Sequence, residues 1–208
     1  MQTRKVVIGG IALIAILVSI GLITRGLRSP GEEIQSEIAL ELGMVLGDEI
    51  IRQLDGKGSV IIITRPLAEN IRHKAMEEVR ALRKAIQSGT GIKVKDVVEL
   101  TADDYAEISP MFRGRGLPHG ALQRLMDEYP NAAALVSLAG QPLMHEALEE
   151  MEEPRPKIFC LAVGTLPLRG LFEWSVLDAA AVRGENSEEG GSPRYEVFTQ
   201  ETMEYLEF

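Results

Sequence analysis

The stretch Ser59-Val60-Ile61-Ile62-Ile63-Thr64 decides the fold of this chain. It holds four β-branched apolar residues in a row, without the polar residue at every second position that a half-exposed strand would show. Such a run is typical of a strand buried on both faces, as in a parallel sheet covered by helices on both sides. The turn residues Asp55-Gly56-Lys57-Gly58 precede the run and mark where the strand begins.

Segments of similar character alternate with helical patterns along the rest of the chain. Further strands are predicted at 94–100, 132–138, 157–163 and 176–182, with a sixth, edge strand at 195–199. Helices are predicted at 30–54 and 69–87, and shorter ones are expected after Thr101, from Pro118, from Gln141 and from Pro167. This alternation predicts an α/β fold: a three-layer sandwich around a mainly parallel sheet of five or six strands.

The helix predicted at 30–54 carries apolar residues every three to four positions, so one of its faces is expected to be buried. The segment Ser29-Pro30-Gly31-Glu32 is a capping box that starts this helix. Gly43 and Gly47 lower the helix propensity, but they would allow a neighbouring element to pack closely against the helix.

The composition excludes several classes of protein. Of the 208 residues, 45% are hydrophobic and 25% are charged, and the formal net charge is −9. This is a globular composition for one domain and an appendage, and the acidic balance argues against a nucleic-acid binder. The single cysteine, Cys160, cannot form an internal disulfide, and it is expected to be buried because it lies in an apolar run.

The N-terminus carries a candidate membrane span. Val6 to Thr24 is a run of nineteen residues without a charge, and as a helix it would be about 28 Å long, close to the hydrocarbon thickness of a bilayer. A cleavable signal peptide is the alternative, but its apolar region is usually shorter and residues 23–26 make a poor cleavage site. We therefore predict a single-pass anchor at 1–28 and one α/β domain at 29–208. Arg4, Lys5 and the α-amine precede the run, and Arg25 and Arg28 follow it. This small difference favours a cytoplasmic N-terminus and a periplasmic domain.

Four short motifs follow one another along the chain. They are LDGKGSVII at 54–62, the pair Asn70 and Arg72, DEYPNAAALV at 127–136 and SVLDAAAV at 175–182. In this order they resemble the second lobe of the type I periplasmic binding proteins, the sugar-binding and repressor-like kind. The resemblance spans roughly 32–182 and implies a Rossmann-like lobe.

The departures from that family concern ligand binding. The family binds its ligand between two lobes, whereas this chain is long enough for only one. Gly164-Thr165 stands where the family often has an acidic residue after the fourth strand, and the aromatic residues that line the cleft in sugar binders have no clear counterpart here. The resemblance therefore supports the fold more than it supports solute capture.

Candidate ligand-binding residues follow from a general rule for open parallel sheets, in which ligands lie outside the carboxyl ends of the strands. The candidates at those positions are Arg65, Asn70, Arg72, Gln141 and Thr165. Arg65, Asn70 and Arg72 could hold a carboxylate or a polyol. In the alternative interpretation, Asn70 caps a helix and the arginines are solvated.

The other polar clusters have structural alternatives. Asp103 and Asp104 could form an acid–base pair or bind a cation, but a capping box that starts at Thr101 also explains them. Gly114-Arg115-Gly116 could cradle an anion ahead of a helix, or could be a surface loop. The histidines lie on separate predicted elements without metal-ligand spacing: His73, His119 and His145. We therefore predict no catalytic residue, no metal site and no cofactor.

These observations favour a non-enzymatic, membrane-anchored domain that binds a protein partner or a second copy, as an accessory subunit of a membrane complex. The alternative is a module that binds a small ligand, such as a sugar or an amino acid, at the strand ends, with two chains supplying two lobes. A third hypothesis is a hydrolase or transferase that uses Asp103, Asp104 or His119.

Overall fold

The computed structural model describes residues 30–66, 69–106, 108, 116–143, 155–162, 165, 168–183 and 195–203. The predicted span at 6–24, and with it the boundary of the predicted anchor, lies outside these residues. Within the described ranges, no helix is both long and apolar enough to cross a membrane. The chain divides into two compact units, residues 1–37 and 38–208, and the second unit contains the sheet.

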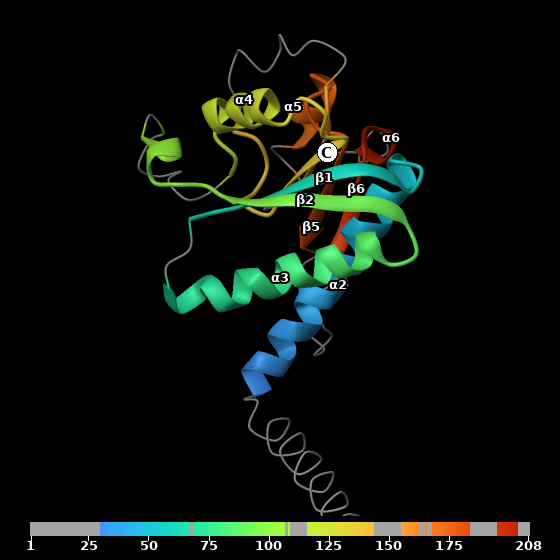
Figure 1. Ribbon diagram of the computed structural model, residues 1–208, viewed down its shortest axis with the longest axis vertical. Helices are drawn as coiled ribbons and strands as arrows, with labels where there is room; N and C mark the ends of the chain where they lie inside the picture. The colour runs from blue at the N-terminus through green and yellow to red at the C-terminus, as the bar shows by residue number, and fades with distance from the viewer. Residues whose placement is uncertain are drawn as a thin grey trace, which may run out of the picture. The chain divides into compact units, whose positions relative to one another are not determined.

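A six-stranded sheet forms the centre of this second unit (Figure 1). Its strands are β1 (Lys57–Thr64), β2 (Gly91–Glu99), β3 (Ala134–Ser137), β4 (Lys157–Ala162), β5 (Ala179–Arg183) and β6 (Tyr195–Phe198). They are ordered β2-β1-β3-β4-β5-β6. Neighbouring strands from β2 to β5 pair in parallel, and β6 pairs antiparallel with β5. The predicted mainly parallel sheet and its sixth, edge strand are confirmed.

Helices cover both faces of the sheet, because β1 has no polar face to expose. Val60 and Ile62 pack into a core with α2 (Pro30–Gln53) and α3 (Glu69–Gln87). Ile61 and Ile63 point the other way, into a second core that includes α4, α5 and α6. These three helices span His119–Glu128, Leu168–Glu173 and Gln200–Met203. The predicted three-layer sandwich is therefore confirmed for the described residues.

Several predicted element starts differ from those in the structure, and two of the differences have a clear local cause. The strand predicted at 176–182 begins at Ala179, because Ser175 has a left-handed backbone (φ 55°) and the next two residues still bond back to the Leu171 carbonyl. The helix predicted from Gln141 does not begin there, because Pro142 forms an isolated bridge with Leu117. Residues 144–154, where most of that helix was predicted, lie outside the described residues.

The edge strand β2 starts at Gly91, three residues before its predicted start, and it contains a bulge. The register with β1 skips Lys95, so that Val94 and Asp96 oppose consecutive residues of β1. The hydroxyl of Tyr129 donates to Asp96 Oδ2 at 2.6 Å, and Lys95 Nζ lies 5.8 Å from the centre of the Tyr129 ring. A bulge of this kind twists an edge strand and discourages pairing with another chain.

Cys160 lies in β4 and is completely buried, as predicted. Its neighbours in the same core are the apolar side chains of the α4 and α5 face. Burial raises the pKa of the thiol because the thiolate would lose its hydration. The residue therefore acts as a small apolar side chain within the sheet.

Helices α2 and α3 cross at backbone-to-backbone distance, as the two glycines of α2 predict. A Cβ at Gly43 would lie 2.7 Å from the carbonyl carbon of Ala81. A Cβ at Gly47 would lie 2.8 Å from the Cβ of Ala85. The small residues on both helices thus create the close crossing, and no larger side chain fits at Gly43 unless the helix backbones move apart.

Gly43→Ala is expected to lower the free energy of unfolding by about 1–3 kcal/mol, because the added methyl group overpacks against backbone atoms that cannot rotate away. Gly120→Ala is the matched control, since a Cβ added to this helical glycine of α4 would meet nothing within 4 Å. The control should be neutral or stabilising by up to about 1 kcal/mol, through helix propensity. Urea denaturation followed by circular dichroism measures both, and equal effects would contradict the packing argument.

Candidate functional site

The strand order reverses at β1, which marks the place where a ligand crevice is expected at the carboxyl ends of the strands. From β1 the chain passes through α3 to β2 on one side, whereas β3 lies on the other side of β1. Such a reversal leaves a crevice between β1 and β3, where open α/β sheets bind ligands. Arg65 directly follows β1, and Gln141 follows β3. The two residues therefore follow the strands that border this position.

The predicted site residues follow adjacent strands but are not equally close to this crevice. Arg65 is exposed, and Gln141 and Thr165 are half-buried. Neighbouring strands are about 4.8 Å apart, so Thr165, which follows β4, lies about 10 Å from the strand end at Arg65. A ligand of monosaccharide size could contact Arg65 and Gln141 together, and it would reach Thr165 only if it extended across β3.

Arg72 reaches the same edge of the sheet from the first turns of α3. Its Nη2 atom lies 2.9 and 3.1 Å from the two carboxylate oxygens of Glu99, the last residue of β2. Both side chains are partly exposed, at 57% and 40%. Asn70 belongs to the first turn of α3, and its side chain is outside the described part. The structure thus assigns Arg72 an acidic partner that sequence reasoning missed.

The loop after β3 is held by tight backbone packing. Gly140 has a φ of 126°, and a Cβ there would lie 2.8 Å from Cα of Gly116, which itself has a φ of 79°. The Ser137 hydroxyl donates to the Gly140 carbonyl at 2.7 Å, and the Leu117 N–H donates to the Gln141 carbonyl at 2.9 Å. Only glycine fits both positions without strain. The backbone under the Gln141 side chain is therefore fixed before any ligand binds.

Tyr105 completes the support of this loop, and it too was missed from the sequence. It ends the short 3₁₀ turn at Asp103–Tyr105, is 2% exposed, and donates its hydroxyl to the Gly116 carbonyl at 2.9 Å. Burial raises the pKa of Tyr105 to about 12, and the positive charge of nearby Arg65 opposes that rise. Tyr105 therefore holds the glycine crossing from the side of the 3₁₀ turn. Of the predicted anion loop, Gly114 and Arg115 lie outside the described residues.

Asp104 has a structural role rather than the acid–base role considered for it. Its Oδ2 accepts the N–H and the hydroxyl of Thr101 at 2.7 and 2.9 Å, and its Oδ1 accepts from Arg124 at 2.8 Å. This is the backward half of the predicted capping box. Asp103 is exposed in the same turn. Because three donors already hold Asp104, the pair of aspartates is not arranged for acid–base chemistry.

The two described histidines lie on different helices. His73 lies 3.8 Å from Glu77 on the exposed side of α3, and His119 is half-buried at the start of α4. His145 lies outside the described residues. Among the residues that the structure describes, no three His, Cys, Asp or Glu side chains could hold a metal ion together.

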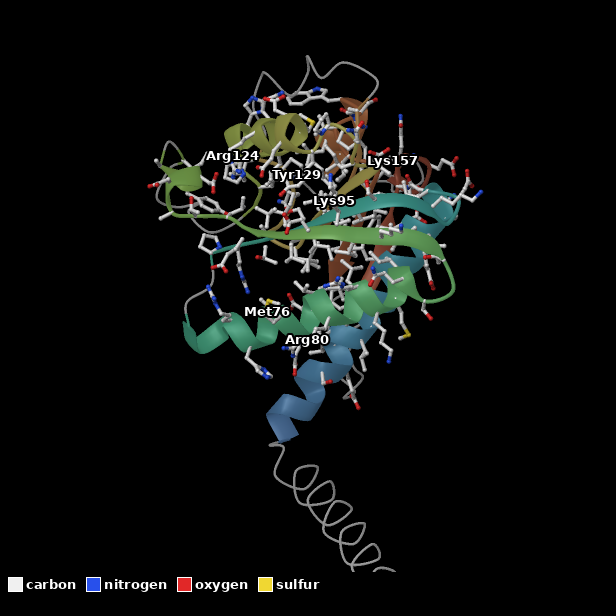
Figure 2. The ribbon with its side chains drawn as sticks, in the orientation of Figure 1. Met76, Arg80, Lys95, Arg124, Tyr129 and Lys157 are labelled. Atoms are coloured by element: carbon white, nitrogen blue, oxygen red, sulfur yellow. The ribbon has the colours of Figure 1, made fainter. Side chains whose placement is uncertain are left out.

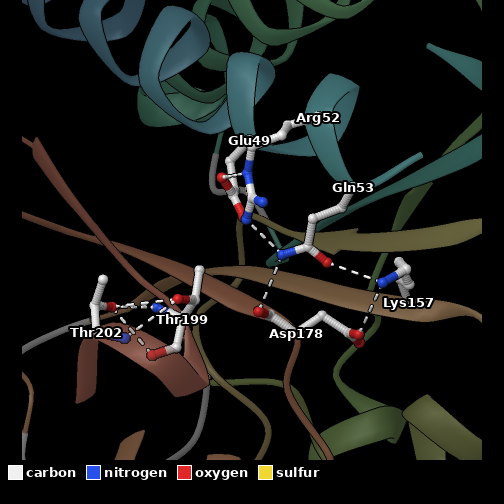
Figure 3. Close-up of polar contacts among 7 residues, drawn as sticks. All are labelled: Glu49, Arg52, Gln53, Lys157, Asp178, Thr199 and Thr202. Atoms are coloured by element: carbon white, nitrogen blue, oxygen red, sulfur yellow. Dashed lines mark hydrogen bonds and ion pairs between the residues drawn. The ribbon is translucent and has the colours of Figure 1, made fainter. Parts of the chain in front are cut away.

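A second polar network lies at the opposite, amino-terminal edge of the sheet (Figure 3). Gln53, at the end of α2, donates to the Asp178 carbonyl at 3.2 Å and to Glu49 at 2.7 Å. Lys157 donates to Gln53 at 3.1 Å and lies 3.6 Å from Asp178 Oδ1. Arg52 pairs with Glu49 at 2.6 Å. These groups satisfy one another and tie α2 to the starts of β4 and β5, so the network stabilises the fold.

Comparisons with known proteins support this fold but show no family. No protein-family model matches the sequence, and no curated protein matches it. Several solved structures are similar. The arabinose-binding protein AraP from Geobacillus stearothermophilus has a TM-score of 0.54 at 15% identity, over 82% of this chain and 63% of its own. A sugar-binding protein of a sugar ABC transporter from Bacillus halodurans has a TM-score of 0.55 at 14% identity, over 80% and 64%.

The solute-binding protein of a 5-methylthioribose transporter from Thermotoga lettingae is also similar, with a TM-score of 0.54 at 12% identity, over 79% of this chain and 55% of its own. At these identities the likeness shows the fold alone. This chain spans less than two thirds of the length of each of the three proteins. The α/β fold is thus that of sugar-binding proteins of ABC transporters, as the resemblance in the sequence predicts.

Asp104→Asn is expected to lower the free energy of unfolding at pH 7 by about 1–2 kcal/mol, because it weakens charge-assisted hydrogen bonds at a side chain that is only 11% exposed. Although burial by itself raises the pKa of Asp104, the hydrogen bonds from Thr101 and Arg124 outweigh it, so that the folded pKa is lowered. The stabilisation is thus fully present above the unfolded value of about 3.9 and is lost as the pH falls through the folded value.

Urea denaturation of the wild type and the variant between pH 7 and pH 2 measures this difference. The two curves should converge at the acidic end. Asp103→Asn, at the exposed neighbour in the same turn, is the control and should leave the stability at pH 7 within about 0.5 kcal/mol of the wild type. A difference for Asp104→Asn that does not change with pH would contradict the assignment.

Proposed function

We propose that this lobe binds a small, neutral, hydroxylated ligand, such as a sugar, at the carboxyl ends of its parallel strands. Arg65 and Gln141 would make the central contacts, and Asn70, Arg72 and Thr165 would contact a larger ligand from the sides. The observation that supports the proposal is the strand order, because Arg65 and Gln141 follow β1 and β3, the two strands between which the order reverses. Their side chains offer several hydrogen-bond donors and one acceptor, which suits hydroxyl groups.

The charges at this edge favour a neutral ligand over an anion. The guanidinium of Arg72 is already matched by Glu99, and that of Arg124 is matched by Asp104. An anion would have to compete with these carboxylates or accept their repulsion. A polyol can accept from Arg65 and donate to the Gln141 amide oxygen without disturbing either ion pair. Of the two ligand classes considered from the sequence, the polyol is therefore favoured.

The comparisons support ligand binding better than the role of an accessory subunit, because the similar structures are named as sugar-binding proteins. The proposal includes the predicted anchor at 6–24 and a periplasmic location for the domain at 29–208. It assigns the chain no catalytic activity. The described lobe would provide one wall for such a ligand, and a second copy or a protein partner would provide the opposite wall.

Binding can be measured by thermal shift and calorimetry against a panel of neutral pentoses, hexoses and their acid derivatives. At least one neutral sugar should stabilise the wild type. Arg65→Ala and Gln141→Ala should each weaken its binding tenfold or more, which corresponds to the loss of one or two hydrogen bonds. Arg52→Ala, at the opposite edge of the sheet, should bind as the wild type does. If no sugar binds, or if all three variants bind equally, the proposed site is wrong.

Glu99→Gln tests the charge argument at the same site. The change leaves the Arg72 guanidinium without its carboxylate, so the variant should bind a sugar acid at least fivefold more tightly than the wild type does. Affinity for the corresponding neutral sugar should change by less than twofold. The double variant Glu99→Gln/Arg72→Gln should lose the gain. A gain that persists in the double variant would show that Arg72 does not face the ligand.

A further inference from the structure

The outer face of α3 differs in charge from the chain as a whole. The formal net charge of the protein is −9. On α3, however, the exposed charged side chains that the structure describes are all basic or histidine. The two described glutamates of this helix, Glu77 and Glu78, are half-buried. Three of the exposed cations lie within five residues, and we call them the basic face: Arg80, Arg83 and Lys84.

The basic face is not neutralised by its surroundings. Arg83 Nε donates to the amide oxygen of Gln87 at 3.3 Å, which leaves its charge unchanged. Among the described residues, no ion pair joins Arg80, Arg83 or Lys84 to a carboxylate, although other arginines of the chain have one, such as Arg124 with Asp104. The face therefore presents three positive charges to whatever lies outside it.

The other sides of α3 are occupied. Val79, Leu82 and Ile86 pack into the core under the sheet, and Ala81 meets Gly43 of α2. Figure 2 shows Arg80 on the helix below the sheet, whereas Lys95 and Tyr129 lie on the other side of the sheet. The basic face thus belongs to the outermost layer, separate from the carboxyl-end crevice and from the network at the amino edge.

We infer that the basic face of α3 docks on the anionic phospholipid headgroups of a bilayer. A membrane is favoured over nucleic acid because only a short segment separates the charge-free run at 6–24 from the start of α2 at Pro30. The net negative charge of the protein repels nucleic acid and anionic lipid alike. If that run is the anchor predicted above, however, it holds the domain permanently beside a lipid surface, whereas no such tether holds a nucleic acid there. Within one Debye length of the surface, the local cations outweigh distant acids.

The expected strength suits a tethered contact. Each Lys or Arg close to an anionic membrane strengthens association about fivefold, so three such residues strengthen it by about a hundredfold. A hundredfold gain gives only weak binding for a protein that must find the membrane from solution. It is sufficient to hold a domain against the membrane when the domain is already tethered there. The docked domain would hold one orientation relative to the membrane. The inference rests on the anchor that the proposed function includes, but it does not depend on sugar binding, because the two surfaces share no residue.

The test compares two lysines of the full-length chain. The protein is reconstituted in nanodiscs of phosphatidylcholine alone or of phosphatidylcholine with phosphatidylglycerol, and it is briefly treated with an amine-reactive reagent before mass spectrometry. Lys84 should react several-fold more slowly in the anionic discs, and about 1 M salt should abolish the difference because it shortens the Debye length to about 3 Å. Lys95, on the other side of the sheet, should react equally in both discs.

Charge variants separate local docking from bulk charge. Arg80→Gln/Arg83→Gln should restore the reaction rate of Lys84 in anionic discs. Arg52→Gln/Arg169→Gln, two exposed arginines elsewhere in the chain, removes the same charge and should leave the slow rate in place.

Three results would overturn the inference. The first is an equal rate for Lys84 in neutral and anionic discs. The second is an equal effect of the two double variants, which would mean that only total charge matters. The third is slow labelling in native membranes combined with normal labelling in anionic discs, which would point to an acidic protein partner instead of lipid.

Discussion

A strand without a polar face is the constraint on which the rest of the structure depends. Four consecutive residues of β1, from Val60 to Ile63, are fully excluded from water. Because successive side chains of a strand point to opposite faces, both faces of the sheet must be covered, and each must have its own helices. The parallel pairing of β1 with both neighbours then sends every connection across the sheet and gathers the loops at its two edges.

The close crossing of α2 and α3 follows from the same constraint. Both helices pack on the same face of the sheet, where their backbones also approach each other closely. Gly43 and Gly47 on one helix, opposite Ala81 and Ala85 on the other, make that approach possible. The small residues therefore serve the packing of a layer, although each glycine lowers the intrinsic stability of its own helix.

The sequence was most informative where structure depends on neighbours along the chain. The helix at 69–87 and the central strand could be predicted because periodicity and β-branching are local signals. Arg65 and Gln141 could be placed at the strand ends by the same reasoning. Two other contacts join residues more than twenty positions apart, and no local pattern predicts them. They are the ion pair of Arg72 with Glu99 and the bridge between Pro142 and Leu117. The late start of β5 has a related cause, because the left-handed backbone of Ser175 cannot be predicted from the apolar residues that follow it.

The burial of Cys160 has a practical consequence for measurements on this chain. Its side chain is enclosed within the central sheet, where an ionised thiolate would be without water. A native protein in dilute thiol reagent therefore behaves as if it had no cysteine at all. Cysteines introduced on the surface, one or two at a time, therefore become the reactive positions, and spin labels or fluorophores can be attached to them. The natural residue need not be replaced first, which would open a cavity in the core.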